Sequence, residues 1–409
     1  MAWESRDVTT CRKMIYIGGG RDIVETLAKS IDLGIEIHYI QKSEKYNPGV
    51  EPYIQKAYCF DFEDFRLLER FGREIFSQLG SASVFTLNES SLAAAAYLRH
   101  LLNLPGNSIE TTNLLLNKME MRRVLNRNNF SFVKFREGQS ENDILEFFNC
   151  VRAPIILKPK NESGSFSVYK IQSESQISNV FRAMQENRIY SFLMEEFLEG
   201  PEISVEAFSN QGVHHVLSVT EKIIMPNFVE IGHVVPGRNS SELQMDLATF
   251  VSDFLKIVGI QYGPTHTEVR VTKKGFFILE SHDRTGGDRI NELVYYARGL
   301  DMKKLAFRQA MGMELTELFE FSKQVDHLAA AIVFLAPQQG QLRSINGVEQ
   351  AKSVKGIKEV LLYVREGDII GPIRDSLDRA GFVIACGETP NIAYDRAKMA
   401  SELIQFEYS

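Results

Sequence analysis

Cysteine is scarce in this chain of 409 residues: there are four cysteines, and no two of them are spaced as a CxxC pair. This excludes a zinc knuckle or a thioredoxin-type motif, and about one cysteine per hundred residues is typical of reduced, intracellular proteins. The chain also lacks any run of about 18 apolar residues that could span a membrane, and its first residues lack the apolar core of a signal peptide. The sequence therefore predicts a cytoplasmic protein with no membrane partner.

A basic excess is missing as well, because 46 lysines and arginines stand against 53 aspartates and glutamates, which gives a formal net charge of -7. A general nucleic-acid binder would normally carry the opposite balance, so we expect no nucleic-acid partner. The balance does not exclude a local basic pocket for a small anion. The length predicts two or three domains, at roughly 150 residues per domain.

Residues 13–110 alternate short apolar segments with helical patterns, which predicts a doubly wound α/β unit. The first apolar segment ends in Gly18-Gly19-Gly20. This turn lacks the full GxGxxG spacing, and Gln41 and Lys42 stand where a dinucleotide site would place an acidic residue. The glycines therefore favour a tight turn between strand and helix, and a Rossmann-type oxidoreductase is a weak alternative.

The remainder of the chain predicts a mixed α+β arrangement with boundaries near residues 110 and 310. The expected elements are a helix over 117–126, strands over 154–159 and 192–196, a hairpin over 203–219, a long helix over 242–258 and a second hairpin over 265–280. A helix and several short strands follow to the end of the chain.

Two lysines are candidates for binding an anion. Lys118 lies at the start of the expected charged helix over 117–126, and Lys158 lies inside the apolar segment 155–159, where a buried charge is costly unless it meets a partner. The loop that follows contains Ser163, Gly164 and Ser165, whose hydroxyls and backbone N–H groups suit phosphates. The alternative is a lysine at a strand end that reaches solvent beside a plain loop.

Acidic residues mark two further segments. Residues 195–202, with the sequence EEFLEGPE, join two expected strands and could serve a nucleotide, although a solvated turn is the simpler interpretation. Glu268 and Glu280 fall on the two strands of the second hairpin, and such facing carboxylates suit a hard cation such as Mg²⁺. The alternative for this pair is a surface position beside Arg270 or Lys274.

The segment directly after Glu280 reads Ser-His-Asp-Arg-Thr-Gly-Gly-Asp-Arg. An arginine beside two glycines can place a guanidinium and backbone N–H groups around one anionic centre. Arg284, Gly286 and Gly287 are therefore the candidate catalytic group. This is the most specific single string in the chain.

Taken in order, these motifs resemble the ATP-grasp superfamily. The matching strings are LKP at 157–159, EEFLEGPE at 195–202, HTEVR at 266–270 and ILESHDR at 278–284. The resemblance implies a fold of the α/β and α+β classes: an N-terminal doubly wound domain before the ATP-grasp unit (residues 1–110), a central lobe or lid (111–190), and a C-terminal lobe with a C-terminal subdomain (191–409).

The resemblance also implies a role for each motif around ATP, with Mg²⁺ as the metal and Mn²⁺ as its substitute. Lys118 and Lys158 would contact the phosphates, and the loop around Gly164 would close over them. Glu195, Glu196, Phe197 and Leu198 would meet adenine, largely through backbone groups, and Glu202 would hold the ribose. Glu268 and Glu280 would bind the metal, and Arg284 with the Gly286 and Gly287 amides would stabilise the reacting centre.

Two positions depart from the superfamily pattern. His282 stands where an asparagine is usual, so it either ligates or orients a metal, or the second ion relies more on Glu280. The phosphate loop has one glycine, Gly164, where relatives often carry several. The identity of the amides that touch phosphate is therefore open.

Within the superfamily the layout resembles the L-amino acid ligases, which form dipeptides. The supporting strings are TLNE at 86–89, GHVVP at 232–236, the run from Glu280 to Asp288, and a C-terminal portion of about 100 residues. In that family Asn88, Glu89, His233 and Asp288 would lie near the amino acids. His233 is equally well explained as a hydrogen-bonded histidine at the edge of the core.

The expected function is ATP-dependent joining of two amino acids, or of an amino-acid derivative and an amino acid, through an acyl phosphate. The alternatives are an ATP-grasp carboxylase or ligase of a purine or other small-acid pathway, and a nucleotide sensor without turnover. The expected partners are small amino-acid substrates. The sequence leaves the oligomeric state open, although family members often dimerise, and it does not identify the two amino acids.

Overall fold

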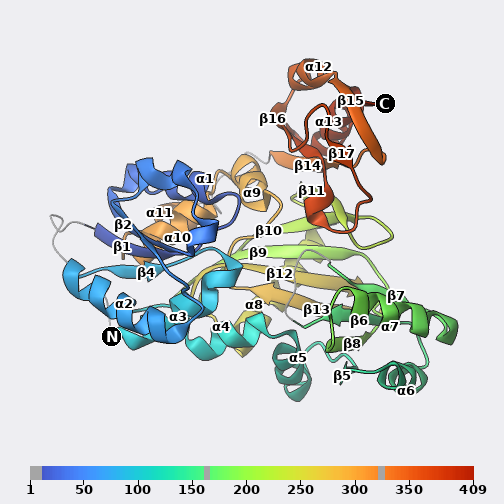
Figure 1. Cartoon of the computed structure of the whole chain (residues 1–409), viewed down its shortest axis with the longest axis horizontal. Coiled ribbons are helices and arrows are strands. Elements are labelled where there is room, and N and C mark those ends of the chain that lie inside the picture. Colours follow the sequence, from blue (N-terminus) through green and yellow to red (C-terminus); the bar gives the residue numbers. More distant parts are fainter. Residues whose placement is uncertain (1–11, 161–165, 321–327) are drawn as a thin grey trace.

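The computed structural model describes residues 12–160, 166–320 and 328–409. Figure 1 shows three groups of elements around a central sheet: an N-terminal α/β unit, a smaller antiparallel lobe, and a C-terminal subdomain at the opposite end of that sheet. In the described residues no helix is both long and apolar enough to cross a membrane.

The N-terminal unit is a parallel sheet in the order β3-β2-β1-β4 with helices on both faces. Alternate residues of β1 serve the two cores: Ile15 and Ile17 pack with α2 and α3, whereas Met14 and Tyr16 pack with α1. The elements are β1 (Arg12–Ile17), α1 (Ile23–Ala28), β2 (Ile35–Gln41), β3 (Lys56–Cys59), α2 (Phe65–Leu79), β4 (Ser83–Phe85) and α3 (Leu92–Leu101). The doubly wound arrangement expected from the sequence is therefore confirmed.

A segment from much later in the chain completes this unit. Phe307 is fully buried against the β1 face, and its ring lies 5.9 Å from that of Tyr16, measured between centroids. Figure 1 shows the helices α10 (Met302–Ala310) and α11 (Thr316–Glu320) beside the N-terminal elements. Sequence reasoning did not anticipate that residues 302–313 would contribute to the first core.

The antiparallel lobe is a four-stranded sheet in the order β5-β8-β6-β7 covered by two helices. Its elements are β5 (Phe135–Gly138), α6 (Glu141–Val151), β6 (Ile155–Pro159), β7 (Tyr169–Ile171), α7 (Ile177–Glu186) and β8 (Phe192–Glu196). The helices α4 (Ile109–Leu116) and α5 (Lys118–Arg127) connect it to the N-terminal unit. The predicted boundaries at 110 and 190 remain predictions.

The central sheet has eight strands in the order β13-β12-β9-β10-β11-β14-β18-β16, all antiparallel pairs. The elements from β9 to α9 are β9 (Glu202–Asn210), β10 (Val213–Ile224), β11 (Glu230–Val235), α8 (Ser241–Val258), β12 (Tyr262–Thr272), β13 (Gly275–His282) and α9 (Ile290–Arg298). Helix α8 covers one face of β9 and β12. Both expected hairpins, β9–β10 and β12–β13, are present.

The C-terminal subdomain extends this sheet with β14, β18 and β16 and adds a small sheet in the order β17-β15-β19. Its elements are β14 (Ala329–Leu335), β15 (Gly340–Asn346), α12 (Val348–Ser353), β16 (Ile357–Leu362), β17 (Ile369–Ile370), β18 (Gly381–Gly387), α13 (Pro390–Leu403) and β19 (Gln405–Tyr408). Because β14 pairs with β11, the subdomain is joined edge to edge with the strand that carries His233.

Candidate active site

A cleft of about 850 Å³, including its opening to solvent, lies between the antiparallel lobe and the central sheet. Its lining contains nine of the candidate site residues that the sequence singled out. These are Lys118, Lys158, Glu195, Glu196, Phe197, Leu198, Glu202, Glu268 and Glu280. Ser163, Gly164 and Ser165 lie outside the described residues.

The lysine of the apolar strand β6 has the partner that its burial demands. Lys158 Nζ lies 2.6 Å from Glu195 Oε2, and the other oxygen of Glu195 accepts a hydrogen bond of 2.8 Å from Arg122 Nε. Burial opposes ionisation of Glu195, but Arg122 and Lys158 outweigh it and lower its pKa to about 2. Arg122, 1% exposed, also donates to the carbonyl of Ile278, so one guanidinium joins α5, β8 and β13.

The rest of the 195–202 segment divides into inward and outward groups. The Glu196 carboxylate accepts from the backbone N–H of Lys134 at 2.8 Å, which directs it to the rim of the cleft. Lys170 Nζ lies over the Phe197 ring, 3.6 Å from its centroid. Glu202 is held by Arg270 Nη2 and Lys222 Nζ at 2.8 and 2.9 Å.

The two candidate metal ligands face each other across the β12–β13 hairpin. Glu268 and Glu280 are paired in the strand register, and their side chains are 17% and 18% exposed. Lys118 Nζ lies 2.8 Å from Glu280, and Lys222 contacts Glu268. The alternative of a surface pair with Arg270 or Lys274 is therefore wrong, because buried lysines from other elements neutralise the two carboxylates.

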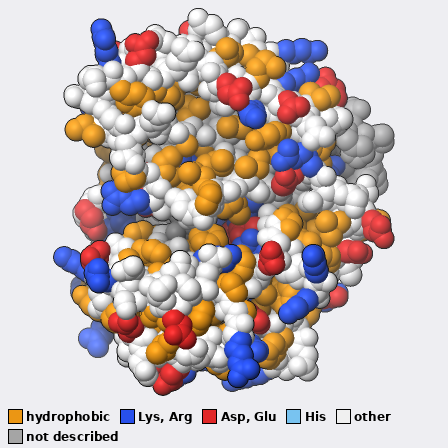
Figure 2. Space-filling view, turned by 90° about the vertical axis from the view of Figure 1, so that its right-hand side faces the viewer, with side chains coloured by type: hydrophobic (Ala, Val, Ile, Leu, Met, Phe, Trp, Pro, Cys, Tyr) orange, Lys and Arg blue, Asp and Glu red, His pale blue; other side chains and the backbone are white. Residues whose placement is uncertain are grey.

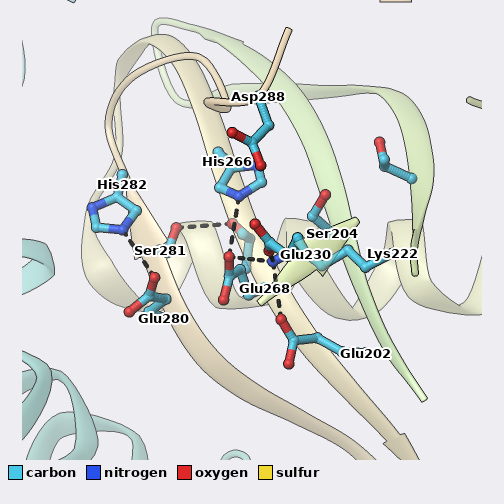
Figure 3. Close-up of polar contacts among 12 residues, drawn as sticks. Glu202, Ser204, Lys222, Glu230, His266, Glu268, Glu280, Ser281, His282 and Asp288 are labelled. Carbon is cyan, nitrogen blue, oxygen red and sulfur yellow. Dashed lines mark hydrogen bonds and ion pairs between the residues drawn. The ribbon is translucent and has the colours of Figure 1, made fainter. Parts of the chain in front are cut away.

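Lys222 is the main residue of this site that sequence reasoning missed. Figure 3 shows its ammonium among three carboxylates, those of Glu202, Glu230 and Glu268. Its side chain is 1% exposed, and its pKa stays well above the ordinary value because the carboxylates outweigh the effect of burial. The local signal was weak, since Lys222 follows Thr220 and Glu221 in the stretch VTEKII at 219–224, whereas Lys158 is flanked by apolar residues in 155–159.

His266 and His282 support the two candidate metal ligands from the same strands. His266 Nδ1 lies 3.0 Å from the fully buried Glu206, and its Nε2 lies 3.4 Å from Glu268. Burial opposes protonation of His266, but Glu206 outweighs it and raises the pKa to about 9. His282 Nε2 lies 3.4 Å from Glu280 Oε1 (Figure 3), a position that orients this carboxylate.

The candidate catalytic arginine meets one of the candidate substrate residues. Arg284 Nε donates to Glu89 Oε2 at 3.2 Å, its Nη2 contacts the same oxygen, and His282 Nδ1 lies 3.8 Å from the other oxygen. Burial raises the pKa of Glu89, but Arg284 and His282 outweigh this and lower it overall. Glu89 therefore links the N-terminal unit to the end of β13. The Asn88 side chain instead accepts from Ser90 and Ser91 in its own turn.

The other two candidate substrate residues also come together. His233 is completely buried on β11, and its Nε2 lies 3.3 Å from Asp288 Oδ2. Gly286, in the same loop as Asp288, lies so close to His266 that an added Cβ would be 2.8 Å from Nδ1. The loop after Arg284 thus packs directly on the strands of the carboxylate pair.

Comparisons with known proteins show to which proteins the chain and its fold are similar. Residues 151–292 match the model of the ATP-grasp domain, and residues 333–409 match that of L-amino acid ligase C-terminal domain 2. The chain superposes on an L-amino acid ligase from Bacillus licheniformis with a TM-score of 0.84 at 23% identity, covering 97% of this chain and 99% of that one. Phosphoribosylglycinamide synthetase from Anaerococcus prevotii shares the fold, with a TM-score of 0.73 at 18% identity, covering 97% and 100%.

Curated relatives include an uncharacterised protein, y4rH, of Sinorhizobium fredii, 27% identical over 82% of this chain and 70% of that protein. Alanine–anticapsin ligase of Bacillus subtilis is 22% identical over 57% of this chain and 54% of that protein. The protein described here has the ATP-grasp fold, and its residues 151–292 match the ATP-grasp domain. Among proteins with this fold, the chain resembles the L-amino acid ligases.

Proposed function

We propose that this protein is an ATP-dependent carboxylate–amine ligase that joins two amino acids, or an amino-acid derivative and an amino acid, and releases ADP and phosphate. The observation that carries the proposal is the facing pair Glu268 and Glu280, set in one cleft with Lys118 and Lys158 and followed directly by Arg284. The match of residues 333–409 to an L-amino acid ligase domain supports amino acids as the substrates.

The donor groups fit ATP and Mg²⁺. Carboxylate oxygens are the ligands that Mg²⁺ takes from proteins, and Glu268 and Glu280 present them from adjacent strands. Lys118 and Lys158 supply positive charge for phosphates, and Glu202 is an acceptor for ribose hydroxyls. Backbone groups of residues 195–198 would meet adenine, and the bound metal would neutralise phosphate charge during transfer.

The residues of the chain then divide the chemical work. A carboxylate can attack the γ-phosphorus only when the repulsion between anions is screened, which is the role of Lys118 and Lys158. The resulting acyl phosphate must be attacked by an amine, and the oxyanion that forms needs fixed donors. Arg284 and the Gly286 and Gly287 amides would provide them, while His282 holds Glu280 and Glu89 holds Arg284.

The amino acids would lie beside this centre, near Glu89 from the N-terminal unit and the His233–Asp288 pair from the other side. Asn88 would contribute through its turn. Amino acids, as small-molecule substrates, would be the partners of the protein, with no nucleic acid.

The proposal is tested by measuring ADP release over a matrix of amino-acid pairs with ATP and Mg²⁺. Amino-acid-dependent ADP formation with a dipeptide as product is the expected result. A requirement for bicarbonate, or turnover with purine intermediates alone, would assign the protein to the alternative carboxylase or purine-pathway reactions. No turnover with any pair would contradict the proposal.

Arg284→Met tests the role of the arginine. Loss of a donor at an oxyanion lowers kcat by about 10²–10³-fold, whereas binding of ATP, measured by calorimetry, is expected to change less than about twofold because the nucleotide contacts lie elsewhere in the cleft. Arg365→Met, at a side chain that is 89% exposed, is the matched control. Near-normal kcat in Arg284→Met would show that this role is assigned to the wrong residue.

A further inference from the structure

The loop between Arg284 and helix α9 has an unusual backbone. Asp288 and Arg289 are consecutive non-glycine residues with positive φ, 52° and 63°. L-residues rarely adopt this conformation, and it persists where surrounding contacts hold it. The contacts that hold residues 288 and 289 are therefore informative about the loop that carries Gly286 and Gly287.

Arg379 of the C-terminal subdomain forms a bidentate ion pair with Asp288. Arg379 Nη1 and Nη2 donate to the two carboxylate oxygens of Asp288 at 2.7 and 2.6 Å. Nη1 also donates to the carbonyl of Glu230, and Nε donates to that of Ser376. A bidentate pair of this kind fixes orientation as well as charge. Arg379 is 6% exposed and lies outside all the motifs identified in the sequence.

A second residue of the same subdomain, Phe334, packs against this ion pair. The Arg379 guanidinium lies over the Phe334 ring, 3.7 Å from its centroid, and the His233 ring meets Phe334 edge to face. Asp288 in turn contacts His233 Nε2. Arg379, Asp288, His233 and Phe334 thus form one contact group, with Asp288 partly exposed and the other three buried. In this group two candidate substrate residues contact two residues of segment 333–409.

Arg289 provides a second anchor of the loop. Its Nη2 lies 2.6 and 2.8 Å from the oxygens of Glu359 in β16, and its Nη1 contacts Glu25 of α1. The C-terminal subdomain therefore holds both residues of the strained backbone step, one through Arg379 and one through Glu359. Gly286 and Gly287 directly precede Asp288 in the short loop 284–289. A displacement of Asp288 therefore also displaces the backbone amides of these two glycines.

We propose that Arg379 is a positioning residue of the amino-acid site: it holds Asp288, and through it the 284–289 loop and His233, in the geometry that receives the acceptor amino acid. This inference rests on the proposed ligase function and extends it, because it gives the C-terminal subdomain a part in the reaction. Among the described residues, Arg379 makes no direct contact with those that line the nucleotide cleft and is connected to them through Glu230 and Lys222, so we expect its main effect on the amino-acid side.

The charge balance agrees with a positioning role. The groups facing Asp288 are Arg379 from the C-terminal subdomain and His233 from β11, with Glu230 close by and itself paired with Lys222. Burial opposes ionisation of Asp288, but Arg379 and His233 outweigh it, and the pKa of Asp288 lies far below its ordinary value. Asp288 therefore stays ionised, and its ion pair with Arg379 persists, around neutral pH.

The test compares three variants of the full-length protein, Arg379→Met, Arg379→Lys and Arg379→Met combined with Asp288→Asn. Arg396→Met is the matched control, because Arg396 is in the same subdomain, is 19% exposed, and contacts Cys386 and Glu388. Steady-state kinetics would give KM for each amino acid and for ATP separately, and thermal unfolding would report stability.

In Arg379→Met we expect KM for the acceptor amino acid to rise about tenfold or more while KM for ATP changes less than about twofold, because a misplaced loop weakens capture of the amine without touching the nucleotide. Arg379→Lys should fall between this variant and the parent. The double variant removes the unpaired charge, so it should recover thermal stability but keep the raised KM.

Two results would overturn the inference: kinetics of Arg379→Met equal to those of Arg396→Met, or a double variant in which stability and the amino-acid KM recover together. The second result would mean that Arg379 merely neutralises Asp288. These failures differ from failure of the proposed function, in which the parent protein itself would show no amino-acid-dependent turnover.

Discussion

Replacing Lys222 by methionine removes one ammonium from among three carboxylates and leaves a side chain of similar length. Lys222 Nζ lies 2.9 Å from Glu202 and 2.7 Å from Glu230, and it also contacts Glu268. The three carboxylates lie within 4.8 Å of one another. Without the lysine they repel each other in a poorly hydrated place.

The magnitude follows from these distances. At about 2.8 Å and an effective dielectric constant of about 20, each pair contributes roughly 6 kcal/mol of Coulomb attraction. Desolvation of the charges offsets most of this sum. Loss of one partner from a buried pair costs about 3–5 kcal/mol, and we expect Lys222→Met to lower the free energy of unfolding near neutral pH by that amount.

The effect should depend on pH with a defined sign. Burial raises the pKa of Glu268, but Lys222 outweighs it and lowers the pKa overall, so this carboxylate stabilises the fold above its ordinary pKa and the contribution is lost as pH falls. The variant lacks the contribution. The difference between parent and variant should therefore be largest near neutral pH and shrink as pH falls from about 4.5 toward about 2.

The assay is urea unfolding followed by circular dichroism, with and without magnesium chloride. A divalent cation can replace the missing ammonium among three carboxylates, so Mg²⁺ should stabilise Lys222→Met more than the parent. Lys256→Met is the control, because Lys256 is 63% exposed in a surface pair with Asp253 that is worth at most about 1 kcal/mol. Equal losses in the two variants, or equal stabilisation of parent and Lys222→Met by Mg²⁺, would refute the reasoning.

Two further predictions concern the Arg122–Glu195–Lys158 group. Arg122→Met should lower the free energy of unfolding by about 3–5 kcal/mol. The control is Arg123→Met, next to it on α5 but 41% exposed and paired with Glu120, which should lower this free energy by less than about 1 kcal/mol. Similar losses for the two variants in urea titrations would show that Arg122 does not join the lobes. The folded-state pKa of Glu195 is about 2 and its ordinary value is 4.5, so its charge contributes about 3 kcal/mol above pH 4.5 that disappears as pH falls toward 2. The stability difference between the parent and Glu195→Gln should decrease by this amount over that range, and a constant difference would contradict it.

Local patterns in the sequence were sufficient for much of the fold. The alternation of apolar segments and helical faces in residues 13–110 predicted the parallel sheet, and the turns at 210–212 and 273–275 predicted both hairpins. These features depend on contacts between neighbours along the chain. The packing of Phe307 on the first sheet was not predicted, because a helix 290 residues away from β1 carries no local mark of its destination.

The site shows the same division. The order of Lys118, Lys158, Glu195–Glu202, Glu268, Glu280 and Arg284 was readable from the sequence, since each stands out by its immediate neighbours. Their partners were not: Lys222 on Glu268 and Arg379 on Asp288 are separated from them by 46 and 91 residues. A charged residue in an apolar strand predicts that a counter-charge lies nearby. Which residue supplies that counter-charge depends on the sheet register and on how the C-terminal subdomain joins β11. The sequence by itself determined the chemistry available to this protein, and only the tertiary structure decided which charges neutralise one another and which loop the last subdomain holds.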